Sequence, residues 1–225
     1  MNSSTGQAGP LPERIEAIVR RVFDRFAFLE ESRAGLMATY KALVETFSQG
    51  GVVYLCGNGG SFADAVHIKG ELGKRFKLDR PIRDTEVIEN LKGLPQGEKI
   101  LKELDVGLPV IVLGESHSLR SAAENDGDPT LAYAQELNSF TGCLPGGALL
   151  GISTSGNAQN VIAAMTLAKA YRMTTISFTG PQGGQLAPLS DIDWRVVGDT
   201  TAQVQENQLP LYHALCEMLE AHFFG

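Results

Sequence analysis

The chain has 225 residues, of which 43% are hydrophobic and 20% are charged. This length and composition are typical of one sizeable globular domain and exclude an intrinsically disordered chain. The formal net charge is -7 and no basic cluster occurs along the sequence, so nucleic acid is an unfavourable partner.

The apolar runs are short, and none approaches the ~20 residues that span a bilayer. Residues 1–10 form a polar leader, expected to be flexible, without the apolar segment of a signal peptide. We therefore expect a cytoplasmic protein with no membrane partner. Cys56, Cys143 and Cys216 make neither an even disulfide framework nor a C-x-x-C pair, and Cys56 and Cys216 lie in apolar runs where thiols usually pack.

Residues 11–49 carry apolar side chains at helical spacing, which predicts two helices that end at Gly50 and Gly51. The β-branched run 52–56 then predicts a buried strand that breaks into glycine. A helix from Phe62 to about Phe76 is expected to follow this strand.

The same alternation returns along the rest of the chain. Strands are predicted at 109–114, 147–153, 173–180 and 191–197, and helices at 158–172 and 201–224. Strands alternating with helices predict an α/β fold, with a doubly wound, mostly parallel sheet covered by helices on both faces, in a single domain over residues 11–225. In such sheets, ligands bind beyond the carboxyl ends of the strands.

The segment 82–108 interrupts this alternation. Its apolar spacing predicts two short, highly charged helices around the turn 93–97, with the stripes Val87, Ile88, Leu91 and Ile100, Leu101, Leu104. Helices this short are marginal in water unless their stripes pack on something. We treat this segment as a helical insert.

The motif GNGGS, at residues 57–61, lies where the first strand turns into a helix. Glycine allows the backbone to approach a ligand closely, and Ser61 can cap the helix and donate to an anion at its positive end. A turn and N-cap that serve the fold alone would have the same sequence. The motif is not G-x-x-x-x-G-K-[ST], so a nucleoside triphosphate P-loop is excluded.

The motif STSGN, at residues 153–157, repeats this arrangement after another strand. The hydroxyls of Ser153, Thr154 and Ser155, with backbone N–H groups, make a neutral cup of donors. Such a cup suits a phosphomonoester dianion. A capped helix with spare hydroxyls is the alternative.

Two pairs of polar residues have the chemistry of ligands or of acid and base groups. His67 and Glu71 are four residues apart and share one helix face. Gln205 and His213 lie on the closing helix about 12 Å apart along an ideal axis, with Pro210 between them to bend it. Taken alone, both pairs are equally typical of ordinary surface and core positions.

Together, these motifs resemble a known family. The strings CGNGGSFADAVHIKGELGKRF, ISTSGNAQNVIAA, TGPQGG and TAQVQENQLPLYHALCEMLE are similar, in order and spacing, to the phosphoheptose isomerases of the sugar isomerase (SIS) domain superfamily. The resemblance implies a flavodoxin-like sheet, a place in carbohydrate metabolism and the conversion of sedoheptulose 7-phosphate into D-glycero-D-manno-heptose 7-phosphate. It also implies a zinc-associated homotetramer with active sites between subunits.

The resemblance assigns roles to individual residues. The substrate-binding set would be Asn58, Gly59, Gly60, Ser61, Ser153, Thr154, Ser155, Asn125, Asp126 and Gln205. One Zn²⁺ or other divalent ion per site would be held by His67, Glu71, Gln205 and His213. Glu71 and His213 would be the acid and base groups of an aldose–ketose isomerisation through an enediol. Because Glu71 and His213 are also candidate metal ligands, the metal is left open as catalytic or positional.

Three features depart from the family pattern. Ala158 stands where a fourth phosphate-binding hydroxyl is usual, Pro210 is unexpected in the closing helix, and the insert 82–108 is absent from typical members. We expect the insert to leave the sheet near its carboxyl edge and to pack over the strand ends or against a neighbouring subunit, shaping the sugar end of the pocket. A solvated surface excursion is the alternative.

Other functions are compatible with this fold. One is a non-catalytic SIS-domain regulator, such as an initiator-binding protein, which is not expected to keep the whole set of His, Glu, Gln and His. A sugar-phosphate sensor and an isomerase of a different phosphosugar are two more.

Overall fold

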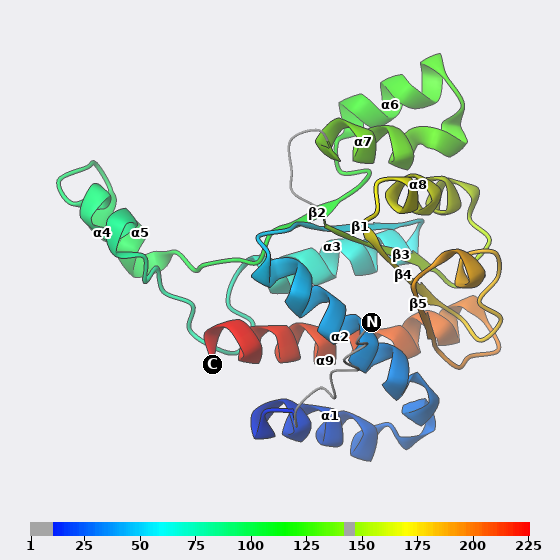
Figure 1. Ribbon diagram of the computed structural model, residues 1–225, viewed down its shortest axis with the longest axis horizontal. Coiled ribbons are helices and arrows are strands. Elements are labelled where there is room, and N and C mark those ends of the chain that lie inside the picture. The colour runs from blue at the N-terminus through cyan, green and yellow to red at the C-terminus, as the bar shows by residue number, and fades with distance from the viewer. Residues whose placement is uncertain (1–10, 142–146) are drawn as a thin grey trace, which may run out of the picture.

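Five short strands form the centre of the molecule. In the computed structural model, which describes residues 11–141 and 147–225, they make one parallel sheet in the order β2-β1-β3-β4-β5 (Figure 1). The strands are β1 (Val53–Gly57), β2 (Val110–Val112), β3 (Ala148–Ser153), β4 (Thr174–Thr179) and β5 (Ile192–Arg195). The predicted fold class is confirmed, while the leader 1–10 and Cys143 lie outside the described residues.

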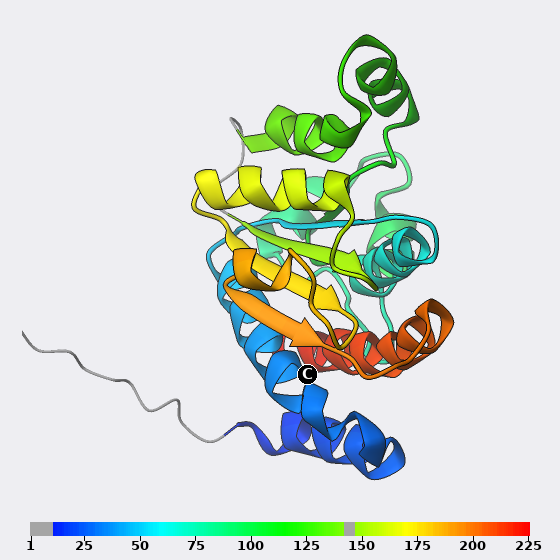
Figure 2. The same ribbon diagram turned by 90° about the vertical axis from the view of Figure 1, so that its right-hand side faces the viewer.

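Helices cover both faces of the sheet because alternate strand residues point to opposite sides. Val53 and Leu55 face a core shared with α1 (Glu13–Arg25), α2 (Arg33–Ser48), α3 (Gly60–Gly73) and α9 (Thr201–Phe224). Tyr54 and Cys56 face a second core with α7 (Ala132–Thr141) and α8 (Gln159–Ala170). Figure 2 shows the arrows pointing one way, with α8 above the sheet and α2 and α9 below it.

The predicted strands and helices are confirmed, apart from small shifts of their ends. The closing helix α9 includes Pro210 and continues to Phe224. The segment that folds as α6 (His117–Asp126) and α7 is not among the predicted elements. The described residues also form three short 3₁₀ segments, η1 (Ala27–Ser32), η2 (Pro129–Leu131) and η3 (Ala187–Leu189).

Two expectations drawn from composition can be compared with the structure. Cys56 and Cys216 are buried, as predicted, and burial raises the pKa of Cys56 to about 12. Within the described residues, no helix is both long enough and apolar enough to span a bilayer.

The insert forms the predicted pair of short helices, α4 (Thr85–Leu91) and α5 (Gly97–Glu103), which project away from the sheet as an arm (Figure 1). The expectation that it leaves the carboxyl edge is wrong. It joins the end of α3 to the start of β2, where Val53 N–H donates to Pro109 O. Because a helix between parallel strands returns the chain to their amino ends, the arm begins at the edge opposite the predicted phosphate turns.

Within this chain, the arm also does not pack over the strand ends. No residue of α4 is buried, and in α5 only Gly97 is. Val87, Leu94 and Leu104 are among the exposed large apolar residues. Packing against a neighbouring subunit remains a prediction.

Candidate active site

The turn after β1 leads directly into α3. Gly59 is the N-cap, with φ +55°, and α3 begins at Gly60, two residues earlier than predicted. Ser61 is therefore inside the helix, 4% exposed, and does not cap it. Ser61 N–H already donates to Asn58 O at 3.0 Å, whereas the N–H groups of Gly59 and Gly60 have no partner among the described residues. These two groups are available to an anion at the positive end of α3.

Asn58 is held by residues that the sequence motifs did not single out. Its amide exchanges two hydrogen bonds with the amide of Asn160 on α8, at 2.8 and 2.9 Å. The Tyr133 hydroxyl, from α7, contacts both Gly57 O and Asn58 Oδ1. The main role of Asn58 in this geometry is to fix the turn, and one N–H of its side chain remains for a ligand.

The second predicted turn lies beside the first. Gly57 pairs with Ile152 in the neighbouring strand β3, so Ser153–Ser155 follow at the same edge of the sheet. The turn closes through Gly156, whose φ is +67° and where a Cβ would lie 2.0 Å from Gly183 O. Only glycine fits there. The helix α8 starts at Gln159, within one residue of its predicted start, and the hydroxyls occupy a separate turn before it.

Three of the four predicted metal-binding residues come together between α3 and α9. The ligand atoms of His67, Glu71 and His213 all lie within 4.8 Å of one another. His67 Nε2 is 3.1 Å from Glu71 Oε1 and 3.5 Å from His213 Nε2. Two imidazole nitrogens and a carboxylate are a donor set that Zn²⁺ accepts, with a position left for substrate. The residues therefore fit the implied metal.

A buried polar chain lies behind His67. Its Nδ1 is 3.0 Å from the hydroxyl of Tyr212, which is 3.2 Å from Asp64 Oδ1. Burial raises the pKa of Tyr212, with Asp64 contributing, so the hydroxyl keeps its proton and can donate it to Asp64. Without a metal ion, the 3.1 Å contact of His67 Nε2 with the Glu71 carboxylate needs an Nε2–H donor. When an ion is bound, Tyr212 O can accept from His67 Nδ1–H, which leaves the Nε2 lone pair to the ion. That tautomer is the one needed for ligation through Nε2.

His213 opens onto a groove of about 500 Å³ between α1 and α9. Its lining carries three cations, Arg21, Arg25 and Lys77, and two anions, Glu206 and Glu217, and Phe76 borders it. Arg21 and Lys77 are both ion-paired with Glu217. Burial lowers the pKa of His213, and the nearby His67 lowers it further, so this imidazole is neutral near pH 7. Neutral imidazole is the form that binds a metal or accepts a proton.

Gln205 lies at the other end of the site. A Cβ built on Gly60 would be 2.2 Å from Gln205 Nε2, so the side chain packs directly on the first residue of α3. Gly60 precedes His67 by about two helical turns, or about 10 Å. In this geometry, Gln205 belongs with the phosphate turn, and the structure does not bring it to the cluster of His67, Glu71 and His213.

Asn125 and Asp126 lie at the exposed end of α6, where Asn125 Nδ2 donates to Asp126 Oδ1 at 2.8 Å. Among the described residues, no recorded contact joins them to either turn. The single chain therefore does not bring this part of the predicted substrate-binding set to the site.

Known proteins are similar to this chain over most of its length. The SIS domain family matches residues 17–102. Phosphoheptose isomerases from Trichlorobacter lovleyi and Helicobacter pylori are 32% and 34% identical, over 92% and 87% of this chain and 94% and 90% of their own. The chain belongs to the phosphoheptose isomerase family. A phosphoheptose isomerase structure from Francisella tularensis superposes on 92% of the chain and 94% of its own, with a TM-score of 0.69 and 25% identity.

Proposed function

We propose that this member of the phosphoheptose isomerase family is an aldose–ketose isomerase of a phosphosugar. The substrate that best fits its relatives' name is sedoheptulose 7-phosphate, and the product would be D-glycero-D-manno-heptose 7-phosphate. The observation that carries the proposal is the cluster of His67, Glu71 and His213, placed about 9 Å along α3 from Ser61. A sugar held by its phosphate at the turns would extend its carbonyl end toward the cluster.

The phosphate would be bound without a Lys or Arg. The N–H groups of Gly59 and Gly60 and the hydroxyls of Ser153–Ser155 are the donors at the carboxyl edge. The positive end of α3 adds a favourable field for a dianion. Gln205, packed on Gly60, borders this end of the sugar.

Proton transfer would occur at the other end. Glu71 removes the proton from C1 of the ketose, which gives the enediol, and returns it to C2. His213, neutral near pH 7, carries the proton from O1 to O2 as the carbonyl moves from C2 to C1. Each group ends the cycle in the protonation state in which it began. The Tyr212–Asp64 pair keeps His67 oriented throughout.

His67, Glu71 and His213 would also hold one divalent ion, most simply Zn²⁺. Because an imidazole nitrogen that binds an ion cannot accept a proton at the same time, His213 would carry the proton from O1 to O2 only while it is off the ion. When bound, the ion polarises the sugar carbonyl and stabilises negative charge on the adjacent oxygens. Glu71 has two carboxylate oxygens, so one can bind the ion while the other accepts the proton. This division resolves the conflict between its two roles.

We further propose a homotetramer with active sites between subunits. The His67 and Ser155 side chains are exposed in the single chain, and a neighbouring subunit would close the site against water. Excluding water strengthens the electrostatic interactions inside a site.

The experiment that tests the proposal is incubation with a panel of ketose and aldose phosphates in D₂O, with and without chelator. We expect solvent deuterium at C1 and C2 of the heptose phosphates, loss of exchange with chelator, and recovery with Zn²⁺. Exchange that is unaffected by chelation, in protein with far less than one metal per chain, would exclude the metal. Binding without exchange would identify a sensor or a regulator.

A further inference from the structure

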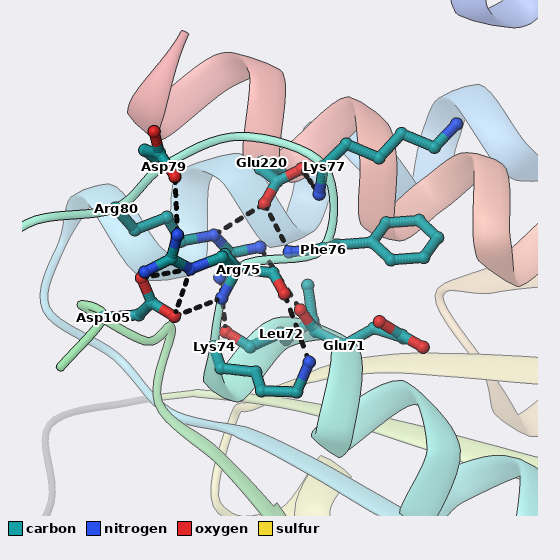
Figure 3. A network of polar contacts seen from close by, with 10 residues as sticks. All are labelled: Glu71, Leu72, Lys74, Arg75, Phe76, Lys77, Asp79, Arg80, Asp105 and Glu220. Atoms are coloured by element: carbon teal, nitrogen blue, oxygen red, sulfur yellow. Dashed lines mark hydrogen bonds and ion pairs between the residues drawn. The ribbon is translucent and has the colours of Figure 1, made fainter. Parts of the chain in front are cut away.

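An ion pair lies fully buried behind the proposed catalytic cluster. Arg80 Nε donates to Glu220 Oε1 at 2.8 Å, and both side chains have no exposed surface (Figure 3). The pair joins the loop after α3 to the end of α9 across 140 residues of sequence. Two buried charges are stable only when their remaining hydrogen-bonding groups are satisfied.

The other nitrogens of Arg80 cap the end of α3. Nη1 donates to Leu72 O at 2.8 Å and Nη2 to Glu71 O at 3.2 Å. The last carbonyls of a helix have no partner within it, and a cation at that end is favoured by the helix dipole. Glu71 is two residues before the end of α3 at Gly73. Leu72 O also accepts from Leu108 N–H at 2.9 Å, so Arg80 shares the capping of this helix end with the backbone before β2.

Glu220 fixes the opposite side of the same network. Its carboxylate accepts from Phe76 N–H at 2.7 Å and from Lys77 N–H at 2.8 Å, in addition to Arg80. Glu220 lies seven residues after His213 on α9, about two turns along the same face. The pair thus connects the helix that carries Glu71 to the helix that carries His213 (Figure 3).

We propose that Arg80 and Glu220 are positioning residues that set the distance and orientation of Glu71 relative to His213. The expected change in kcat rests on the proposed function. The expected change in metal affinity rests only on the cluster of His67, Glu71 and His213. Neither Arg80 nor Glu220 touches the substrate. The planar guanidinium is essential because it donates to a carboxylate and two carbonyls at once, and a lysine ammonium cannot reproduce that geometry.

The test is Arg80→Lys, with Arg33→Lys as the matched control. Arg33 donates two hydrogen bonds to the carboxylate of Glu30 and lies 4.2 Å over the Phe23 ring, as Arg80 lies 4.7 Å over Phe224. Its side chain is 39% exposed, so it controls for the change from Arg to Lys and not for burial. We expect Arg80→Lys to lower kcat by about tenfold or more and to change KM by less than about twofold. Co²⁺ affinity, followed by visible absorption, should fall by about tenfold. Arg33→Lys should leave both unchanged.

A variant without the Glu71 carboxylate shows whether Arg80 acts through Glu71 or through the stability of the whole fold. In a Glu71→Gln background, Arg80→Lys should lower kcat by less than about twofold further, because both changes act on one group. Additive losses would overturn the proposal. If Arg80→Lys does not fold, Glu220→Gln replaces it in every measurement, made below the thermal midpoint. The Gln oxygen can keep the bonds from Phe76 N–H and Arg80 Nε, whereas its NH₂ group cannot accept from Lys77 N–H.

The outcomes separate this inference from the proposed function. Wild-type kcat and Co²⁺ affinity in a folded Arg80→Lys variant would overturn the positioning role while leaving the isomerase intact. A wild-type protein that turns over no phosphosugar, but whose Co²⁺ affinity depends on Arg80, would overturn the proposed function and retain the positioning role.

Discussion

Gly60→Ala tests whether Gln205 belongs to the site, because the new methyl group would meet Gln205 and little else. The added Cβ would lie 2.2 Å from Nε2, 2.7 Å from Cδ and 2.8 Å from Oε1 of Gln205. Ordinary contact begins at 3.4 Å, so the amide must retreat by about 1.2 Å. The amide is the far end of a flexible side chain, so this retreat costs only about 0.5–1.5 kcal/mol in rotamer strain.

The backbone favours the substitution. Gly60 is the first residue of α3 and is not among the residues with positive φ, so its backbone accepts alanine. Alanine is preferred to glycine by up to about 1 kcal/mol, the value for a helix interior. The two terms nearly cancel, so we expect the thermal midpoint to change by no more than a few degrees. Displacing a positioning group by 1 Å is enough to lower kcat/KM by about 100-fold.

The assay compares thermal unfolding and isomerase kinetics for Gly60→Ala and Gly70→Ala. Gly70 lies on the same helix, and a Cβ there would meet nothing within 4 Å, so this control should keep full activity. Combining Gly60→Ala with Gln205→Ala should be no worse than Gln205→Ala alone. Equal kcat/KM for the two glycine variants would refute the assignment of Gln205 to the site.

Three further predictions concern the site, a half-buried histidine and the arm. Glu71→Gln should keep the thermal midpoint and substrate affinity but lower kcat by about two to four orders of magnitude, measured under saturating substrate; wild-type turnover would exclude Glu71 as the proton shuttle. His222 Nδ1 is 2.9 Å from the Tyr40 hydroxyl. Burial, with a smaller contribution from Arg14, lowers the pKa of His222 in the folded chain. The unfolded chain therefore binds this proton at a higher pH than the folded chain does. The free energy of unfolding should therefore fall as the pH drops below about 6.5. Urea titrations at pH 7.5 and 5.5 should show a smaller fall for His222→Gln than for the wild-type protein. An equal fall in the two proteins would contradict the assignment to His222. Replacing residues 83–104 with a short Gly-Ser linker should keep the thermal midpoint, because in this chain only Gly97 of the two arm helices is buried. It should also weaken the association of subunits, measured as oligomer mass by light scattering. An unchanged oligomer mass would show that the arm is a solvated surface excursion.

The sequence predicts the sheet because its strands are short, continuous apolar runs that end in glycine, a pattern that does not depend on distant residues. It misses α6 because this helix buries no residue and so has no apolar stripe to find. The start of α3 at Gly60 depends on the positive φ of Gly59, which no spacing rule indicates.

The candidate site is predicted less completely than the sheet. His67 and Glu71 share a helix face, and His213 joins them because α9 packs on α3, a tertiary fact that only the family resemblance supplied. Asp64 offers a weak signal in hindsight, since it lies three residues before His67 on the same face. Arg80 and Glu220 offered none, because local patterns say nothing of an ion pair formed across the fold.

The position of the arm has a practical consequence. Since the arm joins the sheet at its amino edge, lengthening or replacing it leaves the turns that would hold the phosphate at their own edge of the fold. Loop closure becomes only slowly less favourable with length, so the chain can grow there at small thermodynamic cost. The tip at Gly93–Gln96 is thus a point for attaching a fluorophore or a small affinity tag. Because the arm is also the segment predicted to contact a neighbouring subunit, a fluorophore there would report on assembly, whereas a second folded protein would be expected to interfere with it.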